Sequence, residues 1–209
     1  MATHTKTQFS KAKQSRSEKT LNDLLDAANE LVSTADPKKF TARTLAEKSG
    51  YALGTLTTRL KSVENVFIWV IEKQRGKHIQ SVVKIIEDFD RNKSIEALAV
   101  LLTEKMFMLL LKVNPKVIQF IEGRLIKKEE FSSKYFHFMD PLGKALFNCS
   151  KTNLSNTFRV LTEKEAILMI RALIMVSERP FVEEDPIVGT IEHRRIVIES
   201  FVRLFGKVS

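Results

Sequence analysis

The sequence contains little cysteine, proline or glycine. Among its 209 residues there are one Cys, five Pro and seven Gly. A single cysteine excludes a disulfide framework within the chain and a cluster of thiolate metal ligands, and it is typical of a reducing compartment. We therefore expect a cytoplasmic protein. The scarcity of proline and glycine also leaves long stretches through which a helix can run without a break.

Long apolar runs are missing as well. Runs such as Ala97–Leu102 and Met106–Leu111 are far shorter than the roughly 20 residues that span a bilayer. The first residues, MATHTKTQFSKAKQSRSEK, lack the apolar segment of a secretory signal. These absences predict a protein that has no membrane partner.

The sequence has no pattern that is typical of a metal or catalytic site. The histidines at positions 4, 78, 137 and 193 lack the spacing of metal ligands, and neither a Glu-x-x-His pair nor a Gly-rich phosphate loop occurs. We therefore predict no metal, no cofactor and no enzymatic activity. A helical-bundle enzyme with an apolar pocket is the alternative, although it would lack paired acid and base groups.

Helical periodicity covers most of the chain. Apolar residues recur at steps of three and four residues from Leu21 to Val32, where Ser15 and Glu18 form a capping box upstream. Further helices are expected over about 41–49, 53–60, 94–112, 132–147, 162–177 and 185–205, a long one after Ser62 and another after Asn114–Pro115. Thr41 and Ser94 are the expected N-caps of two of them, and Thr162 forms a second capping box with Glu165. No segment alternates like a strand. We predict an all-α fold of about nine helices.

The segment 41–60 has the pattern of a helix-turn-helix. Four residues fall where two short crossed helices bury their inner faces: Leu45, Ala46, Leu56 and Leu60. Gly50 can supply the positive φ of a tight turn. The residues left on the outside of the second helix are mainly threonine and arginine, which suit the major groove of DNA. An ordinary helical hairpin with a solvated face would show the same pattern.

Residues 16–66 resemble the DNA-binding domain of TetR/AcrR-type transcriptional regulators. The resemblance rests on Arg16, Ala28, Thr41, Leu45, Ala46, Gly50, Gly54, Thr55, Leu56, Ser62 and Glu64. It implies an N-terminal three-helix domain and a larger α-helical body. We accordingly expect a disordered basic arm over 1–14, a DNA-binding domain over 15–61 and a ligand-binding and dimerisation domain over 62–209.

The chain departs from the family pattern at three positions. Thr57 and Val63 stand where the family has a Tyr and a Lys that contact phosphate. Ala52 replaces the Ser or Thr that caps the recognition helix, which costs about 1 kcal/mol of helix stability. These departures keep an alternative open, a degenerate member that senses a ligand or a protein partner without sequence-specific DNA binding.

Positive charge gathers in the part of the chain that would meet DNA. Residues 1–20 carry a net charge of +4 and residues 41–61 a net charge of +3, out of +9 for the whole chain. Such clustering is typical of phosphate contact, although a basic tail can also serve solubility alone. The predicted DNA-binding residues are Lys11, Lys13, Arg16, Thr41, Arg43, Lys48, Leu53, Gly54, Thr55, Thr57, Thr58, Arg59 and Lys61.

The two C-terminal helices are apolar around most of their circumference. A helix that is apolar on two sides needs a second partner, and a second copy would supply it in an isologous four-helix interface. Helices buried within a single chain are the alternative. The residues predicted at a homodimer interface are Ile167, Ile170, Arg171, Ile174, Val197, Phe201 and Leu204.

Phenylalanine and methionine are concentrated in the second half of the chain. These side chains can line an adaptable apolar pocket, or they can simply fill a core. The resemblance implies a pocket for a small effector, which we predict to be apolar, lined by Met106, Phe107, Leu110, Phe120, Phe136, Met139 and Phe147. The resulting hypothesis is a dimeric repressor that a small effector releases from a palindromic operator.

Overall fold

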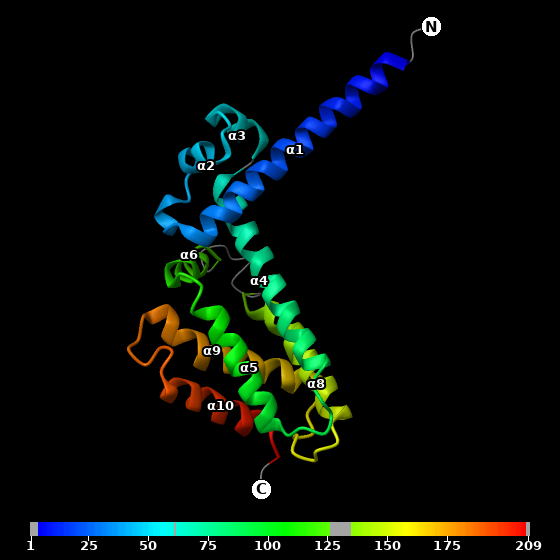
Figure 1. The fold of residues 1–209 in the computed structure, drawn as a ribbon, viewed down its shortest axis with the longest axis vertical. Coiled ribbons are helices and arrows are strands. Elements are labelled where there is room, and N and C mark those ends of the chain that lie inside the picture. The colour runs from blue at the N-terminus through cyan, green and yellow to red at the C-terminus, as the bar shows by residue number, and fades with distance from the viewer. Residues whose placement is uncertain (1–3, 61, 126–134, 208–209) are drawn as a thin grey trace. The chain divides into compact units, whose positions relative to one another are not determined.

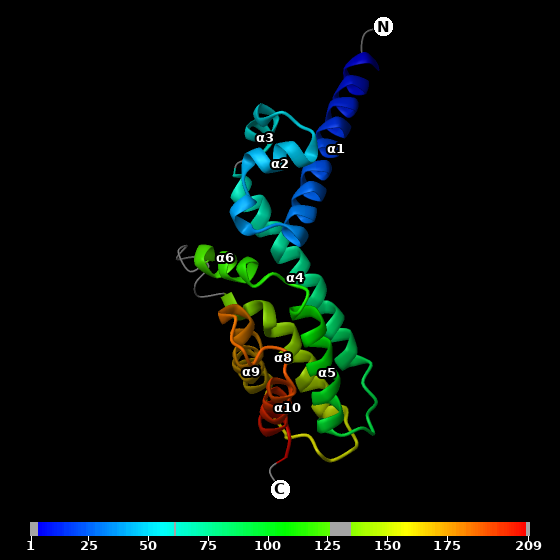
Figure 2. The ribbon, with the colours of Figure 1, turned by 60° about the vertical axis from the view of Figure 1, so that its left-hand side comes forward.

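The computed structural model describes the backbone of residues 4–60, 62–125 and 135–207, and the side chains of 18–60, 62–123 and 137–207. In these ranges the chain forms nine α-helices and two short 3-10 helices (Figures 1 and 2). One isolated bridge, between Phe158 and Gly206, is the only β pairing among the described residues. The all-α fold predicted from the sequence is confirmed.

The described elements follow one another with short connections. In chain order they are α1 (His4–Thr34), the 3-10 helix η1 (Pro37–Lys39), α2 (Ala42–Ser49), α3 (Leu53–Arg59), α4 (Val63–Glu87), α5 (Ile95–Leu110), α6 (Pro115–Leu125), the 3-10 helix η2 (Tyr135–Met139), α8 (Asp140–Thr152), α9 (Glu163–Glu183) and α10 (Ile191–Phe205).

The chain divides into two compact units, Met1–Lys73 and Gln74–Ser209. We call them the N-terminal and the C-terminal unit. The division lies inside α4, later than the boundary at 61/62 expected from the sequence. The reason is that the first turns of α4 complete the N-terminal unit, where Phe67 is fully buried and stacks on Phe40 with ring centroids 4.6 Å apart.

The starts of the first and the last helix differ from the sequence prediction. In the structure α1 begins at His4, so residues 4–14 are helical instead of an unstructured arm; no proline or glycine occurs between His4 and Thr34 to stop the helix. The last helix begins at Ile191 and not at Asp185–Pro186, because Gly189 has a left-handed φ of 72° and Thr190 is the N-cap.

The core of the N-terminal unit joins its helices through a few fully buried leucines. Leu24 of α1, Leu45 of α2 and Leu56 of α3 have no exposed surface. The expected inner face of the helix-turn-helix is thereby confirmed for Leu45 and Leu56.

The core of the C-terminal unit is formed mainly by α5, α8, α9 and α10, with the end of α4 added. In both views α9 and α10 lie side by side (Figures 1 and 2). Helices α8 and α9 approach closely at Gly143, where an added Cβ would lie 2.6 Å from the Cα of Ile167. Only glycine leaves room for this approach.

Candidate nucleic-acid interface

The helix-turn-helix formed by α2 and α3 is held by local signals in the sequence. Thr41 is the N-cap of α2, and its hydroxyl oxygen accepts a hydrogen bond from the Thr44 N–H at 3.2 Å. Gly50 ends α2 with φ 73°, a left-handed conformation in which a side chain would be strained. Both features agree with the sequence prediction, and together they fix the turn between the two helices.

Two polar contacts attach the turn region to α1. The Tyr51 hydroxyl donates to the Asp23 carboxylate at 2.7 Å, and Lys48 pairs with Glu30 at 2.5 Å. The side chain of Lys48 is 39 % exposed, so this predicted DNA contact also has a structural partner. No sequence pattern identifies Tyr51 and Asp23 as a pair, since the two residues are far apart in the chain.

The outer face of α3 presents small side chains to solvent. Leu53 is 50 % exposed, and a Cβ added at Gly54 would meet no atom within 4 Å. The hydroxyls of Thr57 and Thr58 donate to the Gly54 carbonyl at 3.0 and 2.8 Å. Because both hydroxyl protons are used inside the helix, these threonines can offer a ligand their methyl groups and the lone pairs of their hydroxyl oxygens, but no hydrogen-bond donor.

Arginines flank this face on both helices. Arg43 of α2 has a side chain that is 89 % exposed and pairs with Glu47 at 3.3 Å. Arg59 ends α3 and is exposed, whereas Thr55 is partly buried. An exposed ion pair of this kind contributes only about 0–1 kcal/mol, so a phosphate could replace Glu47 at little cost.

The start of α3 lacks a side-chain cap. Ala52 occupies the N-cap position with extended backbone and makes no capping hydrogen bond. At the start of α4, in contrast, the Ser62 hydroxyl oxygen accepts from the Asn65 N–H at 3.3 Å. The prediction that Ala52 leaves α3 without a side-chain cap is confirmed, and its cost in helix stability stays a prediction.

Four predicted DNA contacts lie outside the described side chains. The backbones of Lys11, Lys13 and Arg16 belong to α1, but their side chains are not described, and Lys61 falls outside the described residues. The charge that these residues contribute is therefore known from the sequence alone.

The structure separates the predicted effector residues into groups. Met106, Phe107 and Leu110 of α5 share a cluster with Phe181 and Val197. Met139 and Phe147 belong to the main core of the C-terminal unit, Phe120 is partly buried on α6, and the side chain of Phe136 is not described.

The seven residues predicted at a dimer interface all make contacts inside the chain, and their role between two copies stays a prediction. Ile170, Val197 and Phe201 are buried, and Ile174 and Leu204 pack against the core. Ile167 lies against Gly143, and Arg171 donates to Asp140 at 2.5 and 3.0 Å. Periodicity shows that a helix is apolar on several sides, but it does not tell which side faces the chain's own core.

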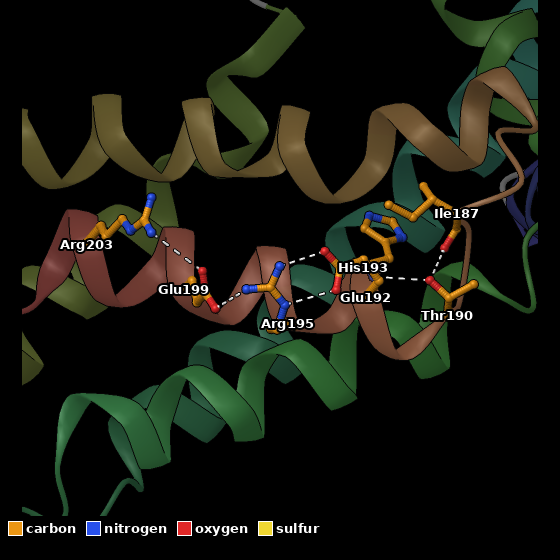
Figure 3. Close-up of polar contacts among 7 residues, drawn as sticks. All are labelled: Ile187, Thr190, Glu192, His193, Arg195, Glu199 and Arg203. Atoms are coloured by element: carbon orange, nitrogen blue, oxygen red, sulfur yellow. Dashed lines mark hydrogen bonds and ion pairs between the residues drawn. The ribbon is translucent and has the colours of Figure 1, made fainter.

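The outer faces of α9 and α10 carry other residues. On α9, Leu168, Met175 and Val176 are 54, 40 and 38 % exposed. On α10 four charged residues of alternating sign lie in a row (Figure 3): Glu192, Arg195, Glu199 and Arg203. Their spacing by three and four residues is visible in the sequence and is the signal that could have identified this row, which the predicted sites do not include.

Two further features were looked for among the described residues, a cluster of metal ligands and a helix long enough to span a membrane. Among those residues no group of three His, Cys, Asp or Glu is placed to hold a metal ion. None of the described helices combines the length and the apolar character needed to cross a membrane. Cys149 is partly buried, and burial raises the pKa of its thiol, so the reactive thiolate is disfavoured.

No protein-family model and no curated protein matches this chain. Solved structures do match. A protein from Mesorhizobium loti assigned to the TetR family of transcriptional regulators has a TM-score of 0.65 at 15 % identity, covering 92 % of this chain and 99 % of that one. The fold is that of TetR-family regulators.

Two further structures assigned to this family agree. The one from Shewanella sp. PV-4 has a TM-score of 0.54 at 14 % identity and covers 90 % of this chain and 99 % of that chain. The one from Vibrio parahaemolyticus has a TM-score of 0.51 at 16 % identity and covers 90 % of this chain and 100 % of that chain. The TetR-like fold therefore extends over nearly the full length of the chain, well beyond the segment that resembles the family in sequence.

Proposed function

We propose that this protein is a DNA-binding transcriptional regulator, a dimeric repressor that leaves a palindromic operator when a small apolar effector binds. The observation that carries the proposal is the outer face of α3, where Leu53, Gly54, Thr57 and Thr58 are exposed beside a glycine turn that is formed as a helix-turn-helix requires. The TetR-like fold supports the same function.

Small side chains on α3 would allow close approach to base edges. In the major groove, the methyl groups of Thr57 and Thr58 would meet thymine methyls, and Arg59 would bond guanine or a phosphate. Thr41 at the start of α2 would lie at a phosphate, which the N-terminus of a helix favours. Arg43 would exchange its exposed partner Glu47 for the DNA backbone.

Two copies would be needed to read a palindrome. Recognition helices of such dimers reach successive major grooves about 34–36 Å apart. The exposed apolar residues of α9, Leu168, Met175 and Val176, support a contact between copies, since large apolar side chains in a group often mark an interface.

An apolar effector suits the cluster around Phe107. Phe107 makes edge contacts with Phe181, at 5.6 Å between ring centroids, and with His193 at 4.8 Å. A ligand that displaced one of these rings from the cluster would alter how α5, α9 and α10 pack against one another. To release DNA, it must bind the DNA-incompetent state more tightly than the competent one, because only differential affinity moves the equilibrium.

The deciding experiment selects bound sequences from a random pool of duplexes. A palindromic consensus would support the regulator, and salt-sensitive binding without sequence preference would support the degenerate alternative that Thr57 and Val63 suggest. On the selected operator, Arg59→Ala should weaken binding by about 1–3 kcal/mol if Arg59 reads a base. Arg91→Ala, a change at an exposed arginine of the C-terminal unit, is the matched control and should leave affinity unchanged.

A further inference from the structure

A buried aromatic cluster lies between α5, α9 and α10. Its centre is Phe107, which has no exposed surface and makes edge contacts with Phe181 and with the imidazole of His193. His193 is almost fully buried, and its ring points from α10 toward α9 (Figure 3). We call these three residues the aromatic cluster. Three flat side chains thus meet inside the C-terminal unit, and one of them is polar.

The two ring nitrogens of His193 differ in what they can bond. Nε2 lies 3.3 Å from the carbonyl oxygen of Val176, and because a carbonyl can only accept, the ring proton is on Nε2. Nδ1 then carries a lone pair. This nitrogen is sealed from solvent and has no hydrogen-bond partner among the described residues. The aromatic cluster therefore contains a buried acceptor that is fixed in direction and unused.

An unused buried acceptor indicates which group a ligand should carry. Burial of a polar atom without a hydrogen bond costs free energy, so such atoms are rare in folded proteins. A binding site can hold one where the ligand supplies the missing partner, and the ligand is then selected for that partner. Since this Nδ1 can only accept, the matching group on the ligand is a donor, such as a hydroxyl.

The surroundings of Nδ1 indicate the rest of the ligand. The rings of Phe107 and Phe181 favour a flat aromatic molecule, which can pack against them edge to face or offset. The Arg194 guanidinium lies 4.7 Å from the centre of the Phe107 ring and is paired with Glu104. Because that charge already has an opposite charge beside it, the aromatic cluster suits a neutral hydroxyl better than a carboxylate.

We propose that the aromatic cluster binds a phenol, whose hydroxyl donates to Nδ1 of His193 and whose ring packs against Phe107 and Phe181. The proposal rests on the proposed function, since it names the chemical class of the effector. It adds one hydrogen-bond donor, at a stated atom of the protein, to a ligand that is otherwise apolar.

Side chains that can move border the aromatic cluster. Met106, Leu110 and Val188 pack against it and are only partly buried. A methionine changes its rotamer at little cost, and Val188 belongs to the connection between α9 and α10. Displacement of these side chains would admit a ring, and it would change how α5 packs against α10.

Two ligands of equal shape and one substitution test the proposal. p-Cresol carries the hydroxyl, and p-xylene has a methyl group in its place. His193→Gln keeps an N–H donor at the position of Nε2, so the Val176 carbonyl stays bonded, but it removes the Nδ1 acceptor. Titration calorimetry of the full-length chain without DNA measures the affinity of both ligands for both proteins.

The ratio of the p-cresol affinity to the p-xylene affinity is the quantity to compare. The two ligands differ in hydrophobicity, but this difference is the same for both proteins and cancels. Lost ring packing at position 193 also acts on both ligands. The ratio should fall at least about tenfold in His193→Gln, which corresponds to 1.4 kcal/mol.

A control variant and a second readout accompany this measurement. His78→Gln makes the same substitution at an exposed histidine of α4, and it should leave the ratio at its wild-type value. NMR of the imidazole nitrogens in the wild type does not depend on the folding of any variant. On addition of p-cresol, the Nδ1 resonance of His193 should shift while the proton stays on Nε2.

The possible outcomes separate this proposal from the proposed function. An equal ratio in the wild type and in His193→Gln, an unchanged Nδ1 resonance or no measurable binding of p-cresol would overturn the phenol site. Selection of a palindromic operator in that case would leave the regulator standing with an effector of another kind. A ratio that falls in a protein without operator selection would support the phenol site and contradict the regulator.

Discussion

At the scale of single residues, a buried histidine compensates for a proline inside α9. Pro180 has no N–H, so the Val176 carbonyl lacks its usual donor four residues later in the helix. His193 of α10 is only 1 % exposed, and its Nε2 lies 3.3 Å from that carbonyl oxygen. Donation to the carbonyl places the ring proton on Nε2, which agrees with an Nδ1 that is buried without a hydrogen-bond partner.

This role predicts a coupling between two substitutions. His193→Leu removes the donor and leaves the Val176 carbonyl unsatisfied, which should cost about 1–3 kcal/mol of unfolding free energy. In a Pro180→Ala background, the new N–H of residue 180 replaces the donor, so the same change should cost less. Urea unfolding of the four proteins measures the coupling. An equal cost in both backgrounds would mean that His193 acts only by packing between aromatic rings.

A second prediction at this scale concerns Glu178 of α9. Burial raises the pKa of this carboxyl; Arg75 and Arg179 act against the shift, and Glu122 adds to it. Because the folded-state pKa is raised, ionisation of Glu178 costs stability at neutral pH. That cost vanishes below the unfolded-state pKa of about 4.3, where both states are protonated.

Glu178→Gln should therefore stabilise the protein at pH 7 and have little effect near pH 4. Urea unfolding at several pH values checks this. Glu183→Gln, which removes an exposed partner of Arg179, is the control and should change stability by no more than about 1 kcal/mol. Destabilisation by Glu178→Gln at pH 7 would show instead that attraction to the arginines outweighs burial.

At the scale of elements, caps decide how firmly each short helix is held. Thr41 caps α2, and Thr162 forms a complete capping box with Glu165 at the start of α9. Helix α3, with seven residues, has no side-chain cap at Ala52. Since short helices gain little from propensity alone, the missing cap should weaken the start of the helix expected to touch DNA.

Ala52→Ser should supply the missing cap of α3. The backbone at Ala52 is already extended, with φ −63° and ψ 146°, so a serine hydroxyl can accept an N–H of the first turn. We expect a gain of about 1 kcal/mol in stability and a matching loss for Thr41→Ala in α2. Thermal unfolding and amide exchange in α3 measure both. Unchanged exchange in α3 would mean that packing of Leu56, and not capping, holds the helix.

At the scale of the whole molecule, the distribution of charge should govern how binding responds to salt. Residues 1–14 contain Lys6, Lys11 and Lys13 and no acidic residue. Each phosphate that a lysine neutralises adds about 0.9 to the slope of log affinity against log salt. Deletion of residues 1–14 should therefore weaken binding to all DNA sequences and reduce the slope by up to about 3 per protomer. A slope that does not change would show that this segment stays away from DNA.

Local signals in the sequence were sufficient to predict much of the fold and part of the candidate site. Thr41, Gly50, Ser94 and the pair Thr162–Glu165 act through backbone groups within a few residues of themselves, so the sequence alone predicts their roles, and the structure confirms them. The exposed face of α3 follows from the burial of Leu45 and Leu56 in the same way, because a helix with one face buried must expose the other.

Only the tertiary structure decided what depends on contacts between distant segments. Periodicity showed that α9 and α10 are rich in apolar residues, but packing against α8 and α5 determined that Ile170 and Phe201 lie inside. The same packing leaves the charged row of α10 outside. The hydrogen bond between His193 and the Val176 carbonyl, which Pro180 leaves without a donor, also depends on a contact between two helices. A short-range hydrogen bond is encoded by neighbours in the chain, whereas the choice of a buried face depends on which other helices share the core.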